Sequence, residues 1–276
     1  MEVLLNETVD GEAAGRGKQE TLHAAIARLH PYPLLFATIT GSHAFGCASP
    51  ESDYDVHGAH LLSIEEVLGL GQPGETIERK GEAPDGRETD IATHDLRKFV
   101  VLLLKGNGNV LEDLYSPLVI CSSPAHEKLK RLAQGCITKQ LAHHYKGMAF
   151  NQQRRMKANE LKKYLHLYRC LLMGIHLMRT GELLMDLPEL ADLYSVPAVH
   201  TLIDYKLQGF DFVPDSAEES AEGHFARGAQ LTAQLEEARQ ASRLPEQPSE
   251  ETRQALEDLV IAVRLAGWTA GGIRQR

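Results

Sequence analysis

The stretch Thr38 to Gly58, TITGSHAFGCASPESDYDVHG, decides the fold that the sequence predicts. The apolar, β-branched run PLLFATIT ends at Gly41 and Ser42, a connection rich in Gly, Ser, Pro and Ala follows, and the chain returns to an extended pattern in SDYDV. This order is typical of a strand, a phosphate-binding loop and a second strand. Because side chains alternate along a strand, we expect Asp53 and Asp55 to project from the same face.

The residue types in this stretch indicate a metal site beside a phosphate site. Two carboxylates on one face repel each other unless a cation lies between them, and oxygen ligands are those that Mg²⁺ and Mn²⁺ prefer, so Asp53 and Asp55 are predicted metal ligands. Gly41 lets the backbone approach a ligand closely, and Ser42 adds a hydroxyl and an N–H that can donate to a phosphate. Gly-Ser or Asp-x-Asp alone would carry little weight, but together and in this order they predict nucleotide chemistry.

At this point the sequence resembles a known family. Gly-Ser followed, after about ten residues, by Asp-x-Asp is the signature of the DNA polymerase β-like nucleotidyltransferases, and the string GSHAFGCASPESDYDVHG is most similar to the predicted bacterial and phage branch associated with RNA repair. The later segment DLRKFVVLLLKGNGNVLEDLYSP, residues 95–117, also resembles the family pattern. The likeness extends over roughly the first two thirds of the chain.

The resemblance implies an α+β protein: a nucleotidyltransferase domain, built on a small mixed sheet with flanking helices, followed by a helical domain. We place the boundary near residues 121–124, where long helical patterns replace strand signals, which gives domains of 1–123 and 124–276. The elements expected in the first domain are a helix over 19–30, a strand over 34–40, a hairpin of strands 75–80 and 87–93, and a helix over 96–105. Ser63 with Glu66 predicts a capping box.

A third carboxylate is needed if two metals are to support nucleotidyl transfer, and it usually comes from a neighbouring strand. The segment ETDIATHDLRKFV offers three candidates. We predict Asp90, with Glu88 on the same strand face as the rival. Asp95 directly precedes an apolar helix, so the role predicted for it is that of an N-cap.

The segment RRMKANELKKYLHLYRCLLMGIHLM predicts one long helix in the second domain, with an apolar stripe and Arg155, Lys162 and Arg169 seven residues apart along its flank. This spacing predicts a basic ridge that faces the cleft between the domains. By the resemblance, Lys162, Lys163 or Arg169 would bind the triphosphate or a nucleic-acid phosphate. The alternative is a solvated basic face in which Arg169 pairs with an acidic neighbour.

Composition limits the other possibilities. The chain has 276 residues and a formal net charge of −9, so a nucleic acid would have to be held by a local basic patch. Four widely spaced cysteines favour reduced thiols over a disulfide framework or a zinc site. With no apparent signal peptide or membrane-length apolar run, we expect a cytoplasmic protein. The sequence leaves the oligomeric state open.

Taken together, the sequence predicts a metal-dependent transfer of a nucleoside monophosphate from an NTP to a hydroxyl, with release of pyrophosphate. Asp53, Asp55 and Asp90 would hold two Mg²⁺ or Mn²⁺ ions, and Gly41 and Ser42 would bind the phosphates. The RNA-repair resemblance implies an RNA 3′ end as the acceptor. A protein or small-molecule hydroxyl, and a non-catalytic nucleotide sensor or antitoxin-like protein, are the alternatives that the sequence leaves open.

Overall fold

The computed structural model describes residues 22–155, 159–214, 217 and 220–271. The predicted mixed sheet is confirmed: five strands lie in the order β3-β4-β2-β1-β5, with β2 parallel to β4 and every other pair antiparallel. The strands are β1 (Leu34–Ile39), β2 (Tyr54–His60), β3 (Thr76–Glu82), β4 (Glu88–Asp95) and β5 (Val119–Cys121). The strands β3 and β4 form the predicted hairpin.

The helices of the first half follow the sequence signals closely. They are α1 (Leu22–Leu29), α2 (Gly41–Ala44), α3 (Ile64–Leu68), α4 (Leu96–Leu104) and α5 (Gly108–Tyr115). The capping box at Ser63 and Glu66 is confirmed, and the Asp95 side chain caps α4 by accepting a hydrogen bond from the Arg97 N–H at 3.0 Å. The first predicted helix extended over residues 19–30, of which 19–21 lie outside the described residues.

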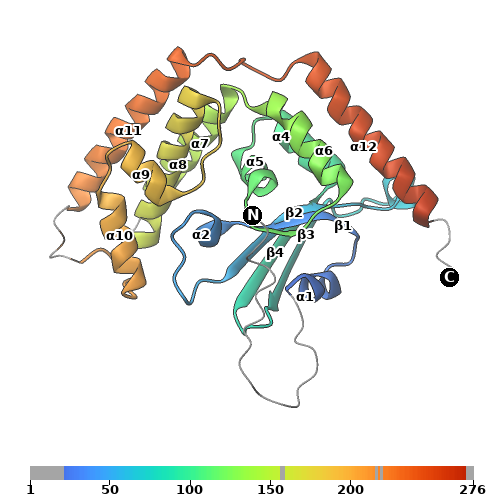
Figure 1. Ribbon diagram of the computed structural model, residues 1–276, viewed down its shortest axis with the longest axis horizontal. Helices are drawn as coiled ribbons and strands as arrows, with labels where there is room; N and C mark the ends of the chain where they lie inside the picture. The colour runs from blue at the N-terminus through green and yellow to red at the C-terminus, as the bar shows by residue number, and fades with distance from the viewer. Residues whose placement is uncertain (1–21, 156–158, 215–216, 218–219, 272–276) are drawn as a thin grey trace.

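The second half is helical, as predicted. Its elements are α6 (Pro124–Ala133), the 3₁₀ turn η1 (Gln134–Cys136), α7 (Gln140–Arg155), α8 (Leu161–Thr180), α9 (Leu187–Leu193), α10 (Ala198–Leu207), α11 (Ala221–Ala241) and α12 (Glu250–Gly271). In Figure 1, α7 to α11 gather at one end of the helical layer that covers the sheet, and α12 lies at the other end of the same layer, where it packs on α6 and α4. None of the described helices is long and apolar enough to span a membrane.

The prediction of one long helix carrying a basic ridge is wrong. Arg155 ends α7, and α8 begins at Leu161, whose N–H donates to the carbonyl of Asp211 at 3.0 Å. This contact with the segment after α10 fixes the start of a separate helix. Arg155 therefore lies on a different helix from Lys162 and Arg169, and those two differ in burial, since Lys162 is exposed and Arg169 is buried.

The hydrophobic core runs across the predicted domain boundary. One continuous cluster contains Phe36 and Phe99 from the first half together with Tyr145 and Tyr168 from the second. We retain 1–123 and 124–276 as a proposed division of the chain, with a shared core between the parts. All four cysteines are free thiols.

The last helix is fixed to the first half by a buried ion pair. The Arg264 guanidinium donates to both carboxylate oxygens of Asp95, at 2.9 and 3.0 Å, and to the Leu62 carbonyl at 2.7 Å. Arg264 is 8% exposed and Asp95 is 2% exposed, so the pair is closed off from solvent. The helix α12 thereby holds the end of β4 and the loop before α3 in place.

Candidate active site

Strand pairing brings two of the predicted carboxylates together. Asp55 on β2 and Asp90 on β4 are register partners in the parallel pair, and Asp53 directly precedes β2. Neighbouring strands lie about 4.8 Å apart, so the three aspartates share one small region where β2 and β4 begin. Partial burial raises the pKa of Asp55, and the negative charges of Asp53 and Asp90 raise it further. This region therefore concentrates negative charge.

Gly41 begins α2 directly against the Asp55 carboxylate. Its φ is +64°, and a Cβ at this position would lie 1.9 Å from Oδ2 of Asp55. The loop before it is held to β2 by a hydrogen bond from the Thr40 N–H to the Asp55 carbonyl at 2.8 Å. Both the positive φ and the missing Cβ are therefore required for the Gly-Ser loop to lie over the Asp55 side chain of β2.

A cavity of about 840 Å³ opens in front of these residues. One wall comes from the first half of the chain and the other from α8 and the end of α10. The described residues that line it are Ser42, Ser49, Pro50, Glu51, Ser52, Asp53, Asp55, Gly86, Arg87, Glu88, Lys162, Lys206, Leu207, Gln208, Gly209, Phe210 and Asp211. Two lysines thus lie across the cavity from the aspartates.

A smaller hollow of about 190 Å³ shares Ser42, Lys162 and Lys206 with this cavity. Its remaining described lining is Gly41, Phe45, Cys47, Leu165, His166, Arg169 and Leu187. Burial lowers the pKa of His166 to about 4, so this imidazole is neutral at pH 7. No aspartate or glutamate appears in this lining, whereas the larger cavity has several. The two hollows therefore differ in charge, and Ser42 lies between them.

Arg169 is close to the smaller hollow but is already paired. Its guanidinium donates to Glu112 Oε2 at 2.7 Å, and both side chains are buried. It also lies over the Phe45 ring, 4.2 Å from the ring centroid. Pairing with an acidic neighbour, one of the two alternatives drawn from the sequence, is therefore observed, and a role in phosphate binding stays a prediction.

The two adjacent lysines of α8 have different surroundings. Lys162 lines both hollows. Lys163 forms an ion pair with Glu160 and donates to the Arg155 carbonyl at 2.9 Å, and it is absent from the described lining of either hollow. The position of the Lys163 ammonium therefore makes Lys162 the more suitable of the two to bind a phosphate.

The three candidates for the third carboxylate are separated by position. Asp95 lies five residues beyond Asp90, about 16 Å along β4, and is occupied by Arg264. Glu88 lines the cavity and stays a rival. The exposed Lys80 on β3 lies 3.0 Å from Asp90 Oδ1 and 3.4 Å from Glu88 Oε1, so a metal ion would compete with this ammonium for either carboxylate.

The carboxylates fit a divalent cation. Within the described part of the chain, no side chain or N–H donates a hydrogen bond to the carboxylate of Asp53 or Asp55, and neither has a cationic partner within salt-bridge distance. Two crowded acids without donors are stabilised when a cation binds between them. The described histidine, cysteine, aspartate and glutamate side chains do not yet form a closed cluster of three ligands. Asp90, the predicted third ligand, is paired with Lys80 at 3.0 Å.

Sequence reasoning missed Lys206. This residue of α10 lines both hollows and donates to the Cys47 carbonyl at 2.6 Å, which fixes its position beside the phosphate loop. Burial lowers its pKa. No sequence signal identifies it, because its place opposite Ser42 depends on how α10 packs against α8 and α9.

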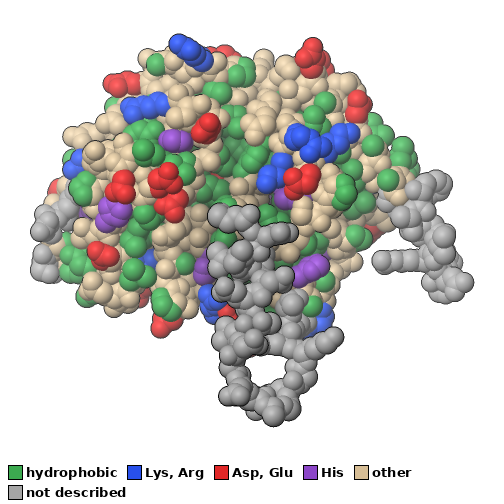
Figure 2. Space-filling model, in the orientation of Figure 1, with side chains coloured by type: hydrophobic (Ala, Val, Ile, Leu, Met, Phe, Trp, Pro, Cys, Tyr) green, Lys and Arg blue, Asp and Glu red, His purple; other side chains and the backbone are tan. Residues whose placement is uncertain are grey.

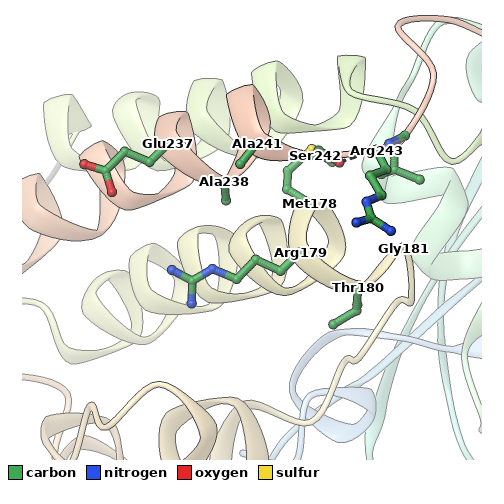
Figure 3. Close-up of a pocket in the computed structure, with 10 residues that line it drawn as sticks. Met178, Arg179, Thr180, Gly181, Glu237, Ala238, Ala241, Ser242 and Arg243 are labelled. Atoms are coloured by element: carbon green, nitrogen blue, oxygen red, sulfur yellow. Dashed lines mark hydrogen bonds between the residues drawn. The ribbon is translucent and has the colours of Figure 1, made fainter.

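A second large hollow, about 690 Å³, lies at the other end of α8 (Figure 3). It is formed by the last turn of α8 and the last turns of α11, with Arg179, Glu237 and Arg243 among its lining. About 27 Å of helix separates Lys162 from Thr180, so this hollow is remote from the aspartates. On the face shown in Figure 2, acidic and basic side chains are interspersed, with several basic ones over α6.

The mixed sheet, the Gly-Ser loop and the paired aspartates define a protein of the polymerase β-like nucleotidyltransferase class. A family model described as RlaP, the RNA repair pathway DNA polymerase beta family, matches residues 16–262. The chain belongs to this family, as the resemblance in its sequence predicted.

Two relatives support the assignment. The chain is 31% identical over 225 residues to "Uncharacterized protein MJ0002" of Methanocaldococcus jannaschii, an alignment that covers 78% of this chain and 88% of that protein. It is 30% identical over 152 residues to "Uncharacterized protein YcgL" of Bacillus subtilis, covering 53% of this chain and 57% of that protein.

Proposed function

We propose that the protein transfers a nucleoside monophosphate from an NTP to the 3′ hydroxyl of an RNA and releases pyrophosphate. The observation that carries the proposal is the position of Asp53, Asp55 and Ser42 in one cavity, with Gly41 directly against the Asp55 carboxylate and Asp90 as the register partner of Asp55 on the next strand. Membership of a polymerase β family linked to RNA repair supports both the reaction and the acceptor.

Asp53, Asp55 and Asp90 would hold two Mg²⁺ or Mn²⁺ ions. When bound, such ions stabilise charge on the phosphoryl oxygens and lower the pKa of the attacking hydroxyl. Asp90 lies on the strand next to Asp55 and would accept the proton of the acceptor hydroxyl. The hydroxyl oxygen attacks the α-phosphorus, the bond from this phosphorus to the bridging oxygen breaks, and pyrophosphate leaves.

The smaller hollow would bind the terminal phosphates. It is lined by Ser42, Lys162 and Lys206 beside the apolar side chains of Phe45, Leu165 and Leu187, and it has no carboxylate among its described lining that would repel a polyanion. The aspartates lie on the other side of Ser42, in the larger cavity. This separation of charge would place the α-phosphate at the boundary between the two hollows, within reach of the metal ligands.

The experiment follows label from each α-labelled NTP, with Mg²⁺ or Mn²⁺, in the presence and absence of an RNA pool. The test variant carries Asp53→Asn and Asp55→Asn. The matched control carries Asp258→Asn, because Asp258 is an exposed acid on α12, far along the chain from the cavity. We expect label on RNA with the wild type and the control, and a loss of about 100-fold or more with the double variant.

Other outcomes would redirect the proposal. Label on the protein would make a protein hydroxyl the acceptor. NTP binding without transfer to any acceptor would favour a nucleotide sensor. Equal transfer by the wild type and the double variant would refute the assignment of the metal ligands.

A further inference from the structure

The end of α10 is shaped by a helix cap that positions one aromatic ring. Gly209 has a φ of +85°, its N–H donates to the Lys206 carbonyl, and the Phe210 N–H donates to the Tyr205 carbonyl, both at 3.0 Å. A cap of this kind folds the residue after the glycine back onto the last helical turn. The rings of Tyr205 and Phe210 accordingly meet edge to face, with centroids 5.7 Å apart.

Phe210 is held in place and yet 44% exposed, and it lines the 840 Å³ cavity. Most of the other residues in that lining are polar or charged. A fixed aromatic face in a polar, water-filled cavity offers a flat apolar ligand a surface to stack on. A nucleobase has such a face, and the phosphates and ribose of the same ligand suit the polar surroundings.

The positions of Lys206 and Phe210 indicate which nucleotide this is. Lys206 lines both the cavity and the smaller hollow, and therefore lies at the boundary where the proposed function places the α-phosphate, while Phe210, three residues beyond the end of α10, lines the same cavity. In a nucleotide, a single ribose separates the α-phosphate from the base. One molecule can therefore contact Lys206 with its phosphates and Phe210 with its base.

We propose that Phe210 is the stacking residue for the base of the incoming NTP. The inference rests on the proposed function, because it takes the phosphate position from it. Since every base has a π face, stacking on Phe210 contributes affinity without selecting among the four bases. The segment Lys206–Asp211 thus contacts both ends of the NTP.

The chain offers a matched control in Phe212. This residue is 56% exposed and lies two positions after Phe210, in an isolated bridge with Glu160. It is not among the described residues that line the cavity. A general effect of removing an exposed phenyl ring from this segment would appear in both variants, whereas a stacking effect would appear only in Phe210→Ala.

The test compares two ligands by titration calorimetry on the full chain with Mg²⁺: an NTP with a methylene group between its α- and β-phosphorus atoms, and inorganic tripolyphosphate. We expect Phe210→Ala to weaken binding of the NTP analogue by about 5- to 100-fold and to leave tripolyphosphate binding within about twofold. Phe210→Trp should keep the affinity for the analogue, and Phe212→Ala should change the affinity for neither ligand. Lys206→Ala weakens both ligands.

Three results would overturn the inference. In the first, Phe210→Ala binds the analogue as tightly as the wild type does. In the second, Phe210→Ala loses affinity for the analogue and for tripolyphosphate equally. In the third, Phe210→Ala raises the KM for RNA and leaves the affinity for the analogue unchanged, which would assign the ring to the acceptor. Failure of the wild type to bind either ligand is a different result, because it would remove the proposed function and this inference together. The two failures are thus distinguishable.

Discussion

Replacing Gly41 with alanine tests the central geometry of the site. The new Cβ would lie 1.9 Å from Oδ2 of Asp55, and ordinary contact begins at 3.4 Å, so the carboxylate or the loop must move by 3.4 − 1.9 = 1.5 Å. A non-glycine residue at a φ of +64° also costs about 1–2 kcal/mol of folding free energy. A misplacement of about 1 Å can reduce activity by about 100-fold, so we expect at least that loss of nucleotidyl transfer.

Gly181→Ala is the matched control. Gly181 has a φ of +78° after the last residue of α8, and a Cβ there would meet its nearest atom, Leu244 Cδ2, at an ordinary 3.6 Å. Gly181→Ala should lose about 1–2 kcal/mol in urea denaturation and Gly41→Ala at least as much, while only Gly41→Ala loses transfer activity and metal-dependent NTP binding. Similar activity in the two variants, or activity of Gly41→Ala within tenfold of wild type, would refute the reasoning about Asp55.

Three further predictions follow from other contacts. Arg264→Met leaves Asp95 buried without its ion pair and should lower the free energy of unfolding by about 3–5 kcal/mol in urea denaturation, whereas an effect below about 1 kcal/mol would show that the pair does not hold α12 in place. Lys80→Ala removes a cation that competes for Asp90, so Mn²⁺ measured by calorimetry should bind about two- to fivefold more tightly; weaker binding would contradict this competition. Burial lowers the pKa of His60 to about 4, below the 6.5 of the unfolded chain, so the folded state favours the neutral ring. The contribution of the neutral His60 ring to the free energy of unfolding is complete above pH 6.5, and up to about 3 kcal/mol of it is lost as the pH falls towards 4. His60→Gln should flatten this part of the pH dependence of the free energy of unfolding.

The sequence was most informative where the signals are local. Asp95 was predicted as an N-cap from the apolar run after it, and it caps α4. No local signal indicated that Asp95 also pairs with Arg264, because 169 residues separate the two partners. The error over the basic ridge has a similar cause. The heptad spacing of Arg155, Lys162 and Arg169 assumes a continuous helix, and the contact of Leu161 with Asp211 fixes a new start for α8.

The candidate site divides in the same way. The sequence alone predicts the Gly-Ser loop, Asp53 and Asp55 as candidate site residues. They lie within 20 residues of one another, and their residue types by themselves indicate phosphate and metal binding. That Asp90 is the register partner of Asp55, rather than merely a nearby acid, depends on the parallel pairing of β2 with β4, which the order of residues does not specify. Lys206 and Phe210 face the aspartates only because α10 packs against α8 and α9.

By itself, the sequence determined the class of fold, and it placed the Gly-Ser loop and the two aspartates at the start of the second strand, because backbone preference, side-chain alternation and residue chemistry act over a few residues. The tertiary structure alone decided that Asp90 is the register partner of Asp55, that Lys162 and Lys206 line the smaller hollow beside Ser42, and that α12 pairs with the end of β4. Those features depend on packing between elements distant in the chain, where burial and strand register, rather than local propensity, fix the contacts.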